Sequence, residues 1–194
     1  MGRLVNKYDH EYSTARIEGF SDAVIAVAIT IMVLQIETPQ SDSKTLQDIG
    51  YFLLTFVIIC RFWARHHCVI RSFPEDTPIA GFWLNNLYLA QICLMPFGIE
   101  LYTEDMPSYS ATAVYCGLFS GSIATLGAMS VVAKKPHVDM FLSALVYLTP
   151  IPFAKVWGSM SLLMWLLLIP VHIITKIITA QEVDEAPSLR RGGE

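Results

Sequence analysis

The sequence predicts an all-α membrane protein with six transmembrane helices in each subunit. Of its 194 residues, 54% are hydrophobic and only 15% are charged, whereas a soluble domain of this size carries about a quarter charged residues. The charges lie in short clusters between long apolar runs, as in a chain that crosses a bilayer repeatedly. No basic stripe with interleaved aromatic residues occurs, so a nucleic-acid partner is not expected.

Six apolar segments approach the length of roughly 20 residues that a spanning helix needs. Their approximate ranges are 18–36, 46–64, 79–101, 110–133, 138–154 and 157–177. The first begins after Arg16, and the second ends in the charged and aromatic stretch 61–67. The fifth is short and carries Pro150 and Pro152. We therefore expect residues 1–177 to form one six-helix transmembrane domain and residues 178–194 to form a short cytoplasmic tail.

The positive charges predict the orientation of these segments. Alternating the connections between two sides places eleven of the 13 Lys and Arg on one side and only Lys44 and Lys155 on the other. Positive residues stay on the cytoplasmic side of a membrane. The sequence therefore predicts a multi-pass protein of the cell membrane with both termini in the cytoplasm.

The first segment carries two stripes at helical spacing. One consists of small residues, which allow another helix to approach closely: Gly19, Ala23, Ala26 and Thr30. The other consists mostly of bulky apolar residues: Phe20, Val24, Val27, Ile31 and Leu34. From the residues alone, lipid contact or core packing is the ordinary interpretation of the bulky stripe.

The start of the first segment is unusually polar. Ionisable groups at the mouth of a membrane helix are costly unless they are paired. Helix-start chemistry accounts for Ser21 and one carboxylate, but Asp22 lies inside the apolar run. We therefore expect hydrogen-bonding partners on the second and third segments, where the candidates are Trp63, His66, His67, Asn85 and Asn86. Which of the two histidines takes part stays open.

The sequence contains no pattern that indicates catalysis or a resident metal. His66 and His67 are adjacent and point to different faces of a helix, so they chelate poorly. No HExxH, GxSxG or Walker motif occurs. We therefore expect neither an enzyme nor a bound cofactor.

The stretch Arg16-x-x-x-Phe20-Ser21-Asp22, followed by the apolar residues 23–30, resembles the signature of the transmembrane-protein-175 family, the lysosomal and prokaryotic potassium channels. The Trp63-x-x-His66 pair is similar to that family as well, as are the stretches 83–85 and 95–97. A single six-helix unit matches the prokaryotic form. The resemblance implies a potassium-selective homotetramer whose four first helices line one central pore, with potassium ions, its own copies and the lipid bilayer as partners.

The resemblance also implies roles for individual residues. It places a hydrophobic constriction at Val27, Ile31 and Leu34, with Thr30 as a hydroxyl beside it, in place of a carbonyl filter. Val27 is smaller than the residue that the family often has there, so the narrowest ring is expected at Ile31 or Leu34. The Thr30 hydroxyl either replaces water lost by the ion or bonds the Ala26 carbonyl, and both possibilities remain open.

The motif residues are expected to hold the helix start without touching the ion. This structural network comprises Arg16, Phe20, Ser21, Asp22, Trp63, His66 and Asn85. Two other functions remain possible: a secondary transporter and a non-conducting subunit of a membrane assembly. Transporters usually show internal repeats and broken helices, and only the prolines of the fifth segment point that way.

Overall fold

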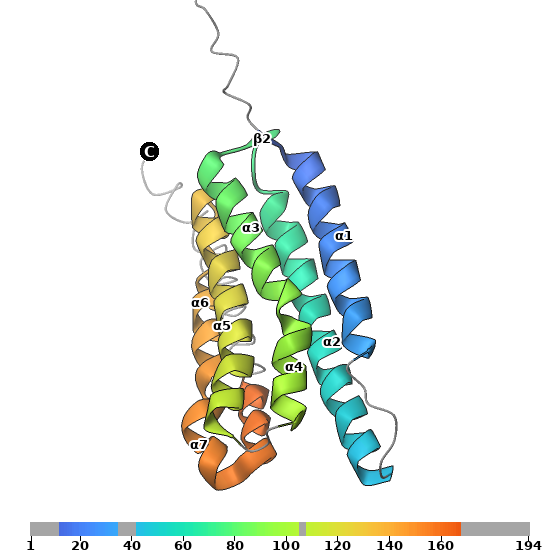
Figure 1. The fold of residues 1–194 in the computed structure, drawn as a ribbon. Helices are drawn as coiled ribbons and strands as arrows, with labels where there is room; N and C mark the ends of the chain where they lie inside the picture. The colour runs from blue at the N-terminus through green and yellow to red at the C-terminus, as the bar shows by residue number, and fades with distance from the viewer. Residues whose placement is uncertain (1–11, 35–41, 105–107, 168–194) are drawn as a thin grey trace, which may run out of the picture.

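The computed structural model describes residues 12–34, 42–104 and 108–167, which form a bundle whose successive long helices alternate in direction (Figure 1). In chain order the elements are β1 (Tyr12–Ser13), α1 (Thr14–Val33), α2 (Asp42–Ile70), β2 (Asp76–Thr77), α3 (Ile79–Cys93), α4 (Met95–Glu104), α5 (Tyr109–Val132), α6 (Val138–Leu148), α7 (Pro150–Trp157) and the 3-10 helix η1 (Gly158–Leu167).

The centre of the bundle is α5, which packs against α2, α3, α4, α6 and α7. Its buried face carries Tyr115 and Phe119, whose rings meet edge-to-face at 4.9 Å between centroids. Trp165 of η1 and Tyr147 of α6 join them, and the Trp165 indole donates a hydrogen bond to the Tyr147 carbonyl at 3.2 Å. This aromatic cluster fastens the last helices of the described chain to the centre.

Each of the first two helices extends further at its polar end than the sequence predicts. α1 begins at Thr14, so Arg16 lies inside the helix and not before it. α2 continues to Ile70, six residues beyond the predicted end at 64. The stretch 61–67 stays helical because its polar side chains find partners across the bundle: Arg65 pairs with Asp139 and His66 with Asn85.

Two predicted segments are broken by proline. The third, predicted as 79–101, divides at Leu94 into α3 and α4, because Pro96 has no N–H to continue the helical ladder. The fifth, predicted as 138–154, breaks at Thr149 and resumes as α7. Pro150 occupies the first position of α7, where a missing N–H costs nothing, so this helix runs on to Trp157.

Three helical stretches are long and apolar enough to cross a membrane: Asp48–Ile70, Tyr109–Val132 and Val138–Trp157. Any 18 consecutive residues of α1 include Arg16, Glu18 and Asp22, and α3 has only 15 residues. The predicted sixth segment, 157–177, is described only as far as 167, and the expected domain boundary at 177 lies outside the described residues. The chain is therefore a mostly helical membrane protein.

A two-stranded ladder, which the sequence did not predict, holds the start of α1. β1 pairs antiparallel with β2, with Tyr12 opposite Thr77 and Ser13 opposite Asp76. The backbone N–H of Thr14 donates to the carbonyl of Glu75 at 2.9 Å. The first turn of α1 is thereby tied to the connection between α2 and α3.

By their places in the helices, most of the described Lys and Arg residues belong to the half of the bundle that holds the start of α1 and the end of α2 (Figure 1). We call it the basic end. Its members are Arg16, Arg61, Arg65, Arg71, Lys134 and Lys135. Lys155 of α7 lies at the opposite end. The alternation of charge that the sequence shows therefore corresponds to a separation in space.

Candidate functional site

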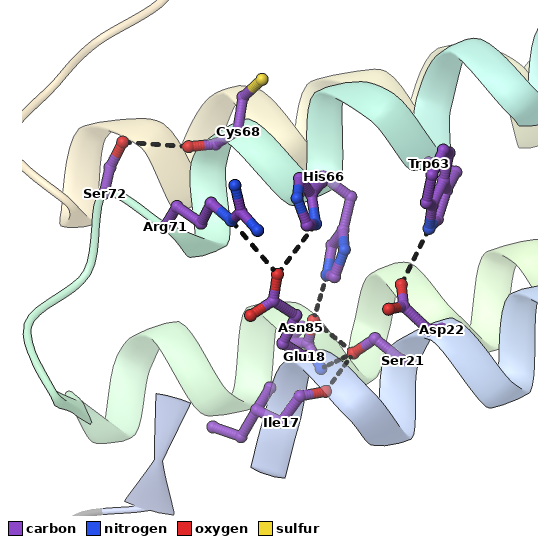
Figure 2. Close-up of polar contacts among 11 residues, drawn as sticks. Ile17, Glu18, Ser21, Asp22, Trp63, His66, Cys68, Arg71, Ser72 and Asn85 are labelled. Carbon is purple, nitrogen blue, oxygen red and sulfur yellow. Dashed lines mark hydrogen bonds and ion pairs between the residues drawn. The ribbon is translucent and has the colours of Figure 1, made fainter. Parts of the chain in front are cut away.

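Three buried polar side chains join α1, α2 and α3 at one level (Figure 2). His66 Nε2 of α2 lies 2.7 Å from Asn85 Oδ1 of α3. Asn85 Nδ2 donates to the hydroxyl of Ser21 of α1 at 3.1 Å. The Ser21 hydroxyl also donates to the Ile17 carbonyl at 2.7 Å. Asn85 therefore bridges the other two helices through its amide.

The two acidic residues at the start of α1 meet donors from α2 (Figure 2). The Trp63 indole donates to Asp22 Oδ1 at 2.8 Å, at an exposed edge where Trp63 is 42% exposed. Glu18 Oε1 lies 2.8 Å from His67 Nδ1 and 3.5 Å from Arg71 Nε. Each of the adjacent histidines thus has its own partner on a different helix.

Arg71 is a member of this cluster that sequence reasoning missed. It lies four residues after His67, and residues at this spacing share one face of a helix. That spacing was the available signal. The second helix was expected to end in the stretch 61–67, before Arg71, so the spacing was not used.

The structure brings Ser21, Asp22, Trp63, His66 and Asn85 together, and leaves the other two motif residues apart. Arg16 is exposed, and within the described ranges no hydrogen bond or ion pair links it to this cluster. Phe20 is 58% exposed on the outer side of α1. Both therefore point away from the helices of their own protomer.

One face of α1 is covered and the opposite face is open. The buried residues are Ile17, Ser21, Ile25, Ala28 and Met32. The exposed residues are Gly19, Phe20, Ala23, Ala26, Val27, Thr30, Ile31, Val33 and Leu34. Both predicted stripes lie on this open face, except for Val24, which packs half-buried against the core.

Beyond Arg16, the open face is apolar apart from the Thr30 hydroxyl. Leu34 is 80% exposed, Val27 56% and Ile31 42%. Val27 and Leu34 are seven residues apart and lie almost in line, whereas Ile31 lies about 40–60° around the helix from both. The Thr30 hydroxyl donates to the Val27 carbonyl at 2.8 Å, not to Ala26, and its oxygen keeps lone pairs for a further contact.

The described part of the chain holds no group of three or more His, Cys, Asp or Glu side chains arranged to bind a metal ion. The polar cluster consists of hydrogen bonds and ion pairs that connect helices. These contacts hold the start of α1 to α2 and α3, beside the open apolar face of α1. We call their central members the clamp: Ser21, Asp22, Trp63, His66 and Asn85.

Comparison with known proteins links the same part of the chain to one family. The family model described as "Endosomal/lysosomal potassium channel TMEM175" matches residues 16–96, which include α1 and the whole polar cluster. A protein of Chamaesiphon minutus named as a potassium channel is 34% identical over 55% of this chain and 59% of its own length. A potassium channel of Streptomyces collinus is 30% identical over 53% of this chain and 55% of its own length.

A more distant relative is the endosomal/lysosomal proton channel TMEM175 of Rattus norvegicus, 28% identical over 57% of this chain and 24% of its own length. This chain therefore spans just over half the length of each of the two bacterial relatives.

The fold matches a solved structure across most of its length. The crystal structure of a lysosomal potassium-selective channel TMEM175 homolog from Chamaesiphon minutus superposes with a TM-score of 0.66. It is 26% identical in sequence, and the match covers 82% of this chain and 96% of that one. Family model, curated relatives and solved structure agree, and the resemblance of this chain to the TMEM175 family is confirmed.

Proposed function

We propose that this protein is a potassium-selective channel that assembles as a homotetramer, with the open face of α1 from each subunit lining a central pore. The observation that carries the proposal is the open apolar face of α1, on a helix whose opposite face is buried and clamped. Its relatives' names as potassium channels support the choice of ion. In this proposal each subunit has six transmembrane helices, and the basic end faces the cytoplasm together with both termini.

The open face suits a pore that works by hydrophobic constriction. Four copies of Val27, Ile31 or Leu34 would form narrow apolar rings, which hold water poorly and gate by dewetting. An ion crossing such a ring sheds part of its hydration, and complete removal costs on the order of tens of kcal/mol. Potassium holds water less tightly than sodium, so the ring penalises sodium more. The Thr30 oxygen, its proton already bonded to Val27, supplies a partial substitute for the lost water.

The small residues of α1 support close packing of four such helices. A Cβ atom added at Gly19 would have no neighbouring atom within 4 Å in the isolated protomer. Helices that carry small residues approach one another closely in membranes. The clamp of Ser21, Asp22, Trp63, His66 and Asn85 would hold each helix start in place without touching the ion.

Two measurements on purified protein test the proposal. In liposomes, the protein should carry potassium down its gradient without a coupled substrate, whereas a secondary transporter would require one and an assembly subunit would carry none. By mass measurement in mild detergent and in lipid, it should be a tetramer. A monomer or dimer in both media would contradict the pore.

The position of the constriction has its own test. Ile31→Asn or Leu34→Ser should raise flux and reduce the discrimination of potassium from sodium, because a wetter ring demands less dehydration. Ile29→Asn is the control, since Ile29 packs half-buried against the core. Val33, on another face by sequence spacing, is 49% exposed and is a less suitable control. Unchanged reversal potentials in both ring variants would move selectivity elsewhere.

A further inference from the structure

The turn between α5 and α6 holds a lysine in an unusual backbone conformation. Lys134 has a φ of 59° and is the one non-glycine residue with positive φ in the described part of the chain. The Lys134 N–H donates to the Val131 carbonyl and the Lys135 N–H donates to the Ser130 carbonyl, each at 3.0 Å. These two bonds form a Schellman motif, whose left-handed position usually holds glycine because a Cβ atom is strained there. A lysine at this position indicates that its side chain has a use that offsets the strain.

Buried contacts fix the conformation of this turn. Ser130 is only 1% exposed, and its hydroxyl donates to the Gly127 carbonyl at 2.6 Å. The same hydroxyl accepts the backbone N–H of His137 at 3.1 Å. The turn is therefore fastened on both sides of the two lysines, whose side chains are exposed.

The charges of the two lysines are not balanced by acids. Within the described residues no ion pair joins Lys134 or Lys135 to a carboxylate, and the nearby Asp139 is paired with Arg65. The dipole of α5 favours positive charge at its C-terminal end. That interaction is equally open to a lysine at an unstrained position, so it does not account for Lys134. A negatively charged partner outside the protomer would complement both lysines.

The turn lies at the level of the lipid headgroups. α5 has 24 residues and therefore measures about 36 Å, whereas the hydrocarbon core of a bilayer is about 30 Å thick. The ends of α5 thus reach the headgroup regions. Next to the turn, the exposed side chains of α5 and α6 are apolar and suit acyl chains: Val131 is 53% exposed, Val138 66% and Leu142 42%. The lysines follow where this apolar surface ends.

We propose that the turn between α5 and α6 binds the phosphate groups of anionic phospholipids at the membrane surface. Each lysine ammonium offers three donors and a compact charge, which suits phosphate. Positive residues close to an anionic leaflet each add to the binding. Because the cytoplasmic leaflet is the anionic one, this surface agrees with the orientation proposed for the basic end. It lies apart from the open face of α1, and the inference does not depend on ion conduction.

The test compares melting temperatures in two bilayers. Full-length protein is reconstituted in nanodiscs of phosphatidylcholine alone, and in nanodiscs of equal parts phosphatidylglycerol and phosphatidylcholine. Lipid that binds the folded protein raises its melting temperature, so wild type should melt higher with phosphatidylglycerol. Lys134→Gln keeps the strain but removes the charge, and should reduce this increase by about 2–4 °C. Lys134→Arg keeps the charge and should retain the full increase.

Lys134→Gly separates strain from charge. In phosphatidylcholine it should melt about 2–4 °C above wild type, because glycine relieves the left-handed conformation. The increase due to phosphatidylglycerol should nevertheless be reduced as in Lys134→Gln. Lys155→Gln is the control at the opposite end, where the ammonium lies 5.8 Å from the centroid of the Tyr109 ring, and it should keep the full increase.

Four results would overturn the inference. The first is an equal increase with phosphatidylglycerol in wild type and Lys134→Gln, and the second is an equal loss in Lys155→Gln. The third is a Lys134→Gly protein that melts no higher than wild type in phosphatidylcholine, which would remove the strain. The fourth is the full increase obtained in phosphatidylcholine with millimolar inorganic phosphate, which would assign the turn to a free anion.

Discussion

Replacing Asn85 with alanine should destabilise the protein by leaving His66 without its partner. The Asn85 Oδ1 atom is an acceptor, so the 2.7 Å contact places the hydrogen of His66 on Nε2. In Asn85→Ala this N–H is buried and unpaired, at a cost of about 1–3 kcal/mol. The lost contact between Asn85 and Ser21 adds little to this free-energy cost, because the Ser21 hydroxyl still donates to the Ile17 carbonyl. For a chain of this size the melting temperature should fall by about 2–12 °C.

Asn86→Ala is the matched control. Asn86 Nδ2 donates to the Phe82 carbonyl of its own helix at 3.1 Å, and within the described residues no hydrogen bond joins its side chain to another helix. Both changes replace asparagine with alanine in α3, so the gain in helix propensity of about half a kcal/mol is common to them. Melting would be followed in detergent by the fraction of protein that stays monodisperse after heating. Equal melting temperatures for the two variants would refute the bridging role of Asn85.

Four further outcomes are expected. Asp22→Asn removes the charge that accepts the indole hydrogen bond and should lower the yield of assembled protein by size exclusion; normal assembly with altered selectivity would place Asp22 in the ion path. Gly127→Ala sets a Cβ 2.9 Å from an aromatic ring of α6 and should destabilise by about 1–3 kcal/mol in the same melting assay. Gly117→Ala in the same helix meets nothing within 4 Å and should stabilise instead. Thr30→Val makes the proposed ring drier and should reduce potassium flux in liposomes, whereas unchanged flux would remove its oxygen from the ion path.

Local residue patterns predicted the helices well where hydrophobicity decides the outcome. The fourth segment, expected at 110–133, is α5 at Tyr109–Val132. The prediction failed where contacts between side chains of different helices decide the structure. The sequence alone does not show that Arg65 will meet Asp139, 74 residues later, and that pair keeps α2 helical beyond its expected end.

Most members of the polar cluster could be predicted from the sequence, but Arg71 and the layout of the cluster could not. Unpaired acids in an apolar run require partners, and that rule identified Trp63, His66 and Asn85. It could not distinguish the buried bridge at Asn85 from the exposed contact at Asp22, since burial depends on how three helices cross. Arg16 and Phe20, grouped with the cluster by motif alone, lie on the open side of α1.

The clamp at the start of α1 also has a consequence for biosynthesis. Ser21 and Asn85 are 64 residues apart. At a translation rate of about 5–20 residues per second, roughly 3–13 s pass between the synthesis of Ser21 and that of Asn85. Asp22 and Glu18 likewise lack their donors Trp63 and His67 until α2 has been made. We expect α1 to settle stably in the bilayer only after the third helix has been made. A nascent chain arrested between α2 and α3 should therefore leave α1 open to labelling by water-soluble reagents, and extension past Asn85 should protect it.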